Sequence, residues 1–162
     1  MIKFKDIILE SNVDKYKIGN VRMFTNVDTD SVIRDPSLMR FCYENARTEL
    51  IKRLKKNENV VYFLGRIKSK DFPSAINHGW IVKDDNIVID PTPTFLVNKN
   101  MNEFTESDMV SFKEASPDIK YVGIQIATDF ILNSDLSAGI GPTLPNNSLW
   151  DEINKTRFDD KI

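Results

Sequence analysis

The chain has a single cysteine, Cys42, and a single histidine, His78, and Asp90 follows them at the end of an apolar run. A thiol nucleophile needs a base to form the thiolate at neutral pH, and that base needs a third group to hold its ring and its tautomer. One cysteine, one histidine and one aspartate in this order supply those parts. The sequence therefore predicts a candidate thiol site built from these three residues.

The relative positions of His78 and Asp90 depend on the length of the loop between two predicted strands. Gly79–Val82 and Ile87–Ile89 are short apolar runs in β-type residues, and the turn-forming residues between them predict a hairpin. A loop made of residues 83–85 puts His78 directly opposite Asp90, with their Cβ atoms roughly 5 Å apart.

A loop made of residues 84–86 leads to a different register. With Asn86 in the left-handed conformation, Asp90 would face Trp80, diagonal to His78 and on the same face of the sheet. A loop of two or four residues would put His78 and Asp90 on opposite faces. Odd loop lengths therefore favour the pair, and even lengths exclude it.

Each of the three residues also has a structural interpretation. Cys42 shares an apolar helical stripe with Leu38 and Ala46, which is typical of a small core residue. His78 stands near an aromatic residue, and Asp90 precedes a proline, where aspartate often ends a strand. The catalytic interpretation depends on the three occurring together.

The surrounding residues resemble a known superfamily. The segments 41–46 (FCYENA), 77–82 (NHGWIV) and 88–92 (VIDPT) are similar to the Cys, His and Asp boxes of the transglutaminase-like and papain-like superfamily. They are most similar to small phage and bacterial proteins with Cys-x-x-Asn-Ala, His-x-Trp and Asp-Pro-Thr boxes. Residues 62–65 and 121–124 match two further strands of that group, so the resemblance covers about residues 37–131.

This resemblance implies a thiol acyl-transfer site with a thioester intermediate. Cys42 would be the nucleophile, His78 the base and acid, and Asp90 the orienting carboxylate. The oxyanion could be bound by the backbone N–H of Cys42. Further candidates for substrate or oxyanion contacts are the side chains of Asn45, Asn77, Trp80 and Gln125. Gln125 is equally compatible with a plain exposed position on a strand.

One feature departs from the superfamily. Its nucleophile usually lies at a helix N-terminus, where the helix dipole lowers the thiol pKa. Here Asp35 and Pro36 predict a helix start about six residues earlier. Either residues 36–40 form a separate turn, or Cys42 gains little from the dipole.

The elements around these residues predict an α+β fold, in which a long Cys-bearing helix packs on an antiparallel sheet. The helix would run from about residue 36 to 56, and shorter helices are predicted near 105–114 and 149–158. Met101, Met109 and Phe112 are expected in the core. Strands are expected at residues 21–24, 60–64, 79–82, 87–89 and 121–126. We expect one domain over 1–162, with a transglutaminase-like or papain-like core at about 35–131, an N-terminal arm at 1–34, and a C-terminal loop and helix at 132–162.

Composition excludes several classes of protein. The chain has 162 residues and a formal net charge of −2, which argues against binding nucleic acid through a basic face. No apolar run approaches the roughly 20 residues of a membrane-spanning helix, and the N-terminal residues do not resemble a secretory signal. A single cysteine excludes an intramolecular disulfide and a Cys-rich zinc site. We expect neither a cofactor nor a metal.

Together these features predict a cysteine-dependent hydrolase or acyltransferase that acts on an amide or isopeptide of a protein or peptide. We expect a cytoplasmic location, in the host if a phage encodes the chain. The alternative is a non-catalytic phage accessory protein that binds or inhibits a host factor or is packaged in the virion. A nucleotide-directed enzyme is a third option. The substrate, the choice between hydrolysis and transfer, and the oligomeric state stay open.

Overall fold

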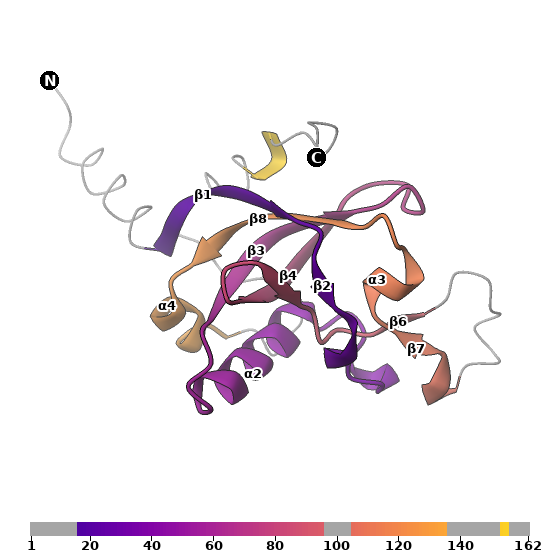
Figure 1. The fold of residues 1–162 in the computed structure, drawn as a ribbon, viewed down its shortest axis with the longest axis horizontal. Coiled ribbons are helices and arrows are strands. Elements are labelled where there is room, and N and C mark those ends of the chain that lie inside the picture. The colour runs from indigo at the N-terminus through magenta and orange to yellow at the C-terminus, as the bar shows by residue number, and fades with distance from the viewer. Residues whose placement is uncertain (1–15, 96–104, 136–152, 156–162) are drawn as a thin grey trace, which may run out of the picture.

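A six-stranded sheet forms the centre of the molecule in the computed structural model, which describes residues 16–95, 105–135 and 153–155 (Figure 1). The strand order is β1-β8-β3-β4-β5-β2, and every neighbouring pair is antiparallel except β2 and β5. The strands are β1 Lys17–Phe24, β2 Val27–Asp28, β3 Val60–Lys68, β4 Ile76–Lys83, β5 Ile87–Ile89 and β8 Lys120–Ile126. The mixed α+β class expected from the sequence is confirmed.

The sheet is strongly curled, because β1 and β2 lie at its opposite edges. Only residues 25 and 26 separate these strands, and so short a link spans on the order of 10 Å. Six flat strands would be roughly 24 Å wide at the usual spacing. The edges must therefore approach each other, and Arg22 of β1 donates a 2.6 Å hydrogen bond to Asp85 in the β4–β5 turn.

The longest helix, α2 (Cys42–Leu54), packs against β3 and β4 on one face of the sheet (Figure 1). Short elements complete the described fold: η1 Thr29–Ser31, η2 Pro36–Leu38, β6 Thr94–Phe95, η4 Glu106–Asp108, β7 Met109–Val110, α3 Phe112–Ala115 and α4 Thr128–Leu132. Residues 153–155 are helical. Among these described residues, no helix has the length and apolar character needed to cross a membrane.

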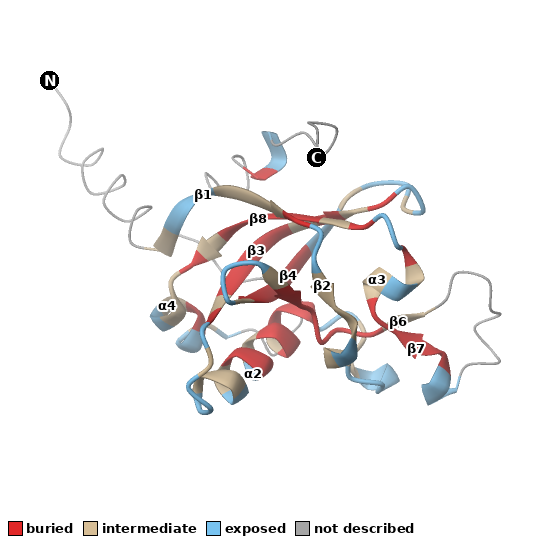
Figure 2. Ribbon diagram, in the orientation of Figure 1, coloured by how far each residue is buried: buried red, intermediate tan, exposed pale blue. Residues whose placement is uncertain are grey.

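Two apolar clusters pack the two faces of the sheet, which accounts for the buried strands in Figure 2. The α2 side contains Ala46 and Leu50 of the helix with Tyr62, Leu64 and Ile81 of the strands. The opposite side contains aromatic residues from several strands, namely Phe24, Phe63, Trp80 and Tyr121. Alternate residues of β4 therefore face different clusters, as the two-residue period of a strand requires.

The strands expected from the apolar runs are all present, and β5 has the predicted bounds. The prediction of an N-terminal arm is wrong for β1 and β2, because both strands belong to the sheet. The expected helix near 105–114 is replaced by a 3-10 turn, a short strand and the four-residue α3. Met109 is buried as predicted, whereas Met101 and the N-terminal segment lie outside the described residues. Of the helix expected at 149–158, only residues 153–155 are described.

Candidate active site

Cys42 is the first residue of α2, so the prediction that one helix runs from residue 36 is wrong. Asp35 does cap a helical turn, since its side chain accepts a 2.9 Å hydrogen bond from the Ser37 N–H, but that turn is the separate η2. Met39 is extended and Arg40 is left-handed, with φ 71°, which a right-handed helix cannot contain. The chain therefore restarts its helix at Cys42, where the helix dipole favours a thiolate.

His78 lies near the start of β4 and is almost completely buried, with 2% of its surface exposed. Its ring is surrounded by aromatic residues. The ring centroid lies 5.2 Å from that of Phe112, 6.3 Å from that of Tyr121 and 6.4 Å from that of Trp80. This packing restricts the ring to one orientation, which a catalytic imidazole requires.

The β4–β5 hairpin brings Asp90 to His78 in the second of the two predicted odd-loop registers. Ile81 pairs with Ile89 and Lys83 with Ile87, so the loop consists of residues 84–86. Asp84 and Asp85 take the left-handed conformation, with φ 50° and 64°, and the expectation that Asn86 does so is wrong. Nε2 of His78 lies 2.7 Å from Oδ2 of Asp90.

The carboxylate of Asp90 is fully engaged by three donors. Besides His78, the Tyr121 hydroxyl donates to Oδ2 at 2.8 Å, and the Thr92 N–H donates to Oδ1 at 3.2 Å. With 1% of its surface exposed, this buried anion needs such partners. Because a carboxylate accepts, Nε2 of His78 carries the proton in this pair, and Nδ1 is left to face the thiol.

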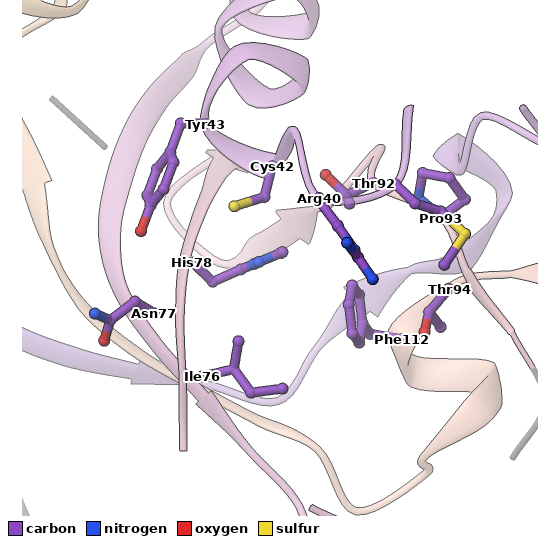
Figure 3. A pocket seen from close by; sticks show the side chains of 11 residues that line it. Arg40, Cys42, Tyr43, Ile76, Asn77, His78, Thr92, Pro93, Thr94 and Phe112 are labelled. Atoms are coloured by element: carbon purple, nitrogen blue, oxygen red, sulfur yellow. The ribbon is translucent and has the colours of Figure 1, made fainter. Parts of the chain in front are cut away.

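Cys42 and His78 lie next to each other, and Figure 3 shows the sulfur beside the imidazole. Burial raises the pKa of the Cys42 thiol. The charge and hydrogen bond of His78 and the N–H of Gly79 lower it further than burial and Asp90 raise it, so the pKa lies below its ordinary value. Burial likewise lowers the pKa of His78, but Asp90 and Cys42 raise it to about 10. The two shifts are those of a thiolate–imidazolium pair.

The end of β5 leaves room for the sulfur at the sheet edge. Ile89 is the last residue of β5 and pairs with Ile81, so Gly79 lies beyond the paired part of β4 on that side. The Gly79 N–H there is close enough to the Cys42 sulfur to lower the pKa of the thiol. A side chain at this position would not fit, because a Cβ would lie 2.6 Å from the Tyr62 hydroxyl oxygen and 2.9 Å from Cδ1 of Tyr43.

A pocket of about 330 Å³ opens beside this pair (Figure 3). The pocket is lined by Cys42 and His78, by several apolar side chains and by a few polar ones. The lining residues are Met39, Arg40, Cys42, Tyr43, Ile76, Asn77, His78, Thr92, Pro93, Thr94 and Phe112. A substrate that enters this pocket would therefore reach the sulfur.

The four other predicted contact residues have different positions. Asn77 is exposed and lines the pocket, as expected for a substrate contact. Asn45 is buried, and its Nδ2 donates to the Leu38 carbonyl at 2.7 Å and to Oγ1 of Thr92 at 3.3 Å, so it joins segments of the fold.

Trp80 and Gln125 lie outside the pocket lining. Trp80 is completely buried and packs over two glycines, since a Cβ on Gly65 or Gly123 would lie 2.8 or 2.7 Å from its Cη2. Gln125 lies in β8 opposite Phe63 and is half-buried. The structure therefore does not bring these two side chains to the pocket beside Cys42.

Sequence reasoning missed several residues that the tertiary structure brings to the site. Tyr121 was seen only as a strand residue, yet its hydroxyl binds Asp90. Phe112 was expected in the core, but it is half-buried and also lines the pocket. Arg40 lines the pocket as well, and no pattern in the sequence singled it out.

Among the described residues, no group of three or more His, Cys, Asp or Glu side chains could hold a metal ion. Searches of protein-family models, of curated proteins and of solved structures gave no match to this chain.

Proposed function

We propose that this protein is a cysteine-dependent hydrolase or acyltransferase that acts on an amide or isopeptide of a protein or peptide. The observation that carries the proposal is the continuous chain of contacts from the Cys42 sulfur to the His78 ring and on to the Asp90 carboxylate, beside an open pocket. Each part has the neighbour that its catalytic role requires.

In the proposed reaction, the Cys42 thiolate attacks the carbonyl carbon of the amide, and the π electrons of the carbonyl move to its oxygen. Nδ1–H of His78 gives its proton to the leaving amine as the C–N bond breaks, which leaves a thioester on Cys42. Water or a second amine then attacks the thioester and gives a proton to Nδ1. The C–S bond breaks, and the thiolate–imidazolium pair is restored.

The first turn of α2 supports binding of the oxyanion. The first intrahelical hydrogen bond runs from the Asn45 N–H to the Phe41 carbonyl at 2.8 Å, and no side chain caps the helix. The N–H groups of residues 42–44 thus have no acceptor within the helix. The Cys42 N–H belongs to the same residue as the reacting sulfur, and we assign it to the oxyanion.

The first experiment measures the reactivity of the thiol with iodoacetamide at pH 7, followed by intact-protein mass spectrometry. Folded wild-type protein should be alkylated at least about tenfold faster than the same protein unfolded in urea, because its thiol is ionised at neutral pH. The variant His78→Ala should lose this acceleration, and Cys42→Ser should take up no label. An inert Cys42 in the folded wild type contradicts the proposal.

The second experiment identifies the reaction itself. Proteins of cells that express the wild type are compared by mass spectrometry with those of cells that express Cys42→Ala. Cleaved peptides would indicate hydrolysis, and new cross-links or amide exchange would indicate transfer. The products therefore show whether water or a second amine takes the acyl group from the thioester.

A non-catalytic binding protein is the second candidate, and one observation favours it. Only 8% of the Cys42 surface is exposed, which is also typical of an inert core cysteine. The iodoacetamide experiment separates the two candidates, because an inert core thiol would react slowly in both wild type and His78→Ala.

A further inference from the structure

Arg40 differs from the other arginines in the described part of the chain. Arg22, Arg34, Arg47, Arg53 and Arg66 each donate at least one hydrogen bond from the guanidinium group to a described residue. Arg40 has no such partner among the described residues, and its side chain is exposed. Its charge is therefore free to interact with a bound molecule.

The position of Arg40 directs this free charge toward the candidate active site. Arg40 lies two residues before Cys42, and its backbone has φ 71°, a conformation that residues other than glycine rarely adopt. Figure 3 shows its side chain reaching across the pocket toward Phe112. The strained link between η2 and α2 thus places a cation at the pocket that also contains the sulfur.

The rest of the pocket does not neutralise this cation. No aspartate or glutamate is among the lining residues, which are otherwise apolar or uncharged apart from the Cys42–His78 pair. The ring of Phe112 and the side chains of Met39 and Ile76 line the same pocket as Arg40 and offer no charge to the guanidinium. A carboxylate in this space would gain a charge-assisted hydrogen bond, and Arg can bind it through two parallel N–H groups.

We propose that Arg40 selects acyl donors that carry a carboxylate next to the reacting acyl group, as in an acidic peptide. This inference rests on the proposed function and adds its substrate class. The carboxylate can come from an Asp or Glu side chain or from a C-terminal α-carboxylate, since both offer the same two oxygens to a guanidinium.

Two alkylating reagents that differ only in charge test the inference. Iodoacetate carries a carboxylate where iodoacetamide carries a neutral amide, and both react with the same sulfur. We expect Arg40→Gln to lower the ratio of the iodoacetate rate to the iodoacetamide rate by about three- to tenfold, because one nearby positive charge is lost. The iodoacetamide rate of each variant serves as the reference, because it corrects the ratio for any change in the thiolate fraction of Cys42.

Three controls make the result specific. Arg40→Lys keeps the charge and should restore most of the ratio, whereas Lys52→Gln removes an exposed charge from α2, the helix that bears Cys42, and should leave the ratio unchanged. Added salt at about 0.5 M should reduce the difference between wild type and Arg40→Gln, as screening predicts. An unchanged ratio in Arg40→Gln would overturn the inference while leaving the proposed function intact.

Slow reaction of wild-type Cys42 with both reagents would overturn the proposed function, and this inference with it.

A second experiment, protection of Cys42 from iodoacetamide by small carboxylates, identifies the source of the carboxylate. N-acetyl-glutamate α-amide has only a side-chain carboxylate, and N-acetyl-glutamine has only an α-carboxylate. The inference is supported if one of these compounds protects Cys42 in wild type and no longer does so in Arg40→Gln, and that compound then identifies the source of the carboxylate. If neither compound protects Cys42, the inference is contradicted.

Discussion

Tyr121 and His78 donate hydrogen bonds to the same oxygen of Asp90, at 2.8 and 2.7 Å, although Tyr121 lies 31 residues farther along the chain than Asp90. Burial, followed by the charge and hydrogen bond of Asp90, raises the pKa of the Tyr121 phenol, which therefore remains a donor. Because Tyr121 belongs to β8, the orientation of the carboxylate depends on the whole sheet between β8 and β5.

Asp90→Asn should reduce the alkylation rate of Cys42 at pH 7 by tenfold or more. An amide no longer stabilises the imidazolium, so the thiol pKa rises and the thiolate fraction falls. Intact-protein mass spectrometry after timed exposure to iodoacetamide measures the rate, and circular dichroism checks the fold. A folded variant with the wild-type rate would show that Asp90 has no part in thiol activation.

Tyr121→Phe is the control variant for Asp90→Asn, because it keeps the Asp90 carboxylate and removes one of its hydrogen-bond donors. It removes one donor from Asp90 and should lower the free energy of unfolding by about 1–3 kcal/mol, measured by urea denaturation. Since His78 keeps its own bond to Asp90, the alkylation rate should change by no more than a few fold. A loss of reactivity as large as that of Asp90→Asn would instead make Tyr121 essential to positioning the imidazole.

The pH dependence of alkylation should differ clearly from that of an ordinary thiol. Burial raises the pKa of the Cys42 thiol, but His78 and the Gly79 N–H bring it below 9.0. The rate should therefore reach its plateau at a lower pH than that of an ordinary thiol and change again only where His78 loses its proton, near its pKa of about 10. In His78→Ala the rate should rise only at a higher pH than in wild type, since the Gly79 N–H alone then opposes the effect of burial on the thiol pKa.

Stability should respond to pH differently in wild type and in Cys42→Ser. The raised pKa of His78 contributes stability that is complete below about 6.5 and is lost as the pH rises toward about 10. The lowered pKa of Cys42 acts in the opposite direction, because its contribution is complete above 9.0 and is lost as the pH falls through the folded value.

In wild type these two dependences oppose each other, so its stability should change less with pH than the stability of Cys42→Ser. In Cys42→Ser only His78 remains, held in its charged form by Asp90, and stability should fall as the pH rises. Urea midpoints at pH 6, 7.5 and 9 measure the difference. Parallel curves for the two proteins would indicate that Cys42 is protonated in the folded state.

Asn45→Ala and Asn77→Ala separate a structural amide from one at the pocket. Asn45 joins the Leu38 carbonyl to Thr92, so its loss should cost about 1–3 kcal/mol of unfolding free energy. Asn77 is exposed and should change stability by less than about 0.5 kcal/mol. An oxyanion role for Asn45 would be supported if activity against an identified substrate fell much more than the folded fraction.

Gly79→Ala tests the close packing around the sulfur. The new Cβ would overlap the Tyr62 hydroxyl and the Tyr43 ring, so unfolding should become easier by about 1–3 kcal/mol. Removing the nearer obstacle in the double variant Gly79→Ala/Tyr62→Phe should recover part of this loss relative to Tyr62→Phe alone. A double-mutant cycle of urea denaturation measures the coupling.

Several parts of the candidate site could be predicted because they depend on residues close together in the sequence. Turn-forming residues between two short apolar runs predicted the hairpin, and the two-residue period of strands then limited the register to odd loops. The choice between those loops could not be made in advance. It depends on Asp84 and Asp85 rather than Asn86 taking the left-handed conformation, and the cross-strand pairs of Ile87 and Ile89 determine that.

The start of the Cys-bearing helix shows where local signals mislead. Asp35 and Pro36 are a valid helix start, yet they begin only a single turn. Arg40 then adopts a left-handed conformation that its residue type disfavours, so nothing local predicts the break. The bond from Asn45 back to the Leu38 carbonyl and across to Thr92 holds the restarted helix in place.

By itself the sequence determined the residue types of the triad, the presence of a hairpin between His78 and Asp90, and the mixed α+β class, because these follow from composition and from short-range periodicity. Only the tertiary structure decided that α2 begins at Cys42, that Tyr121 reaches Asp90, and that Arg40 lines the pocket. Each of these depends on contacts between segments far apart in the chain, and only the packing of the folded sheet and helix brings those segments together.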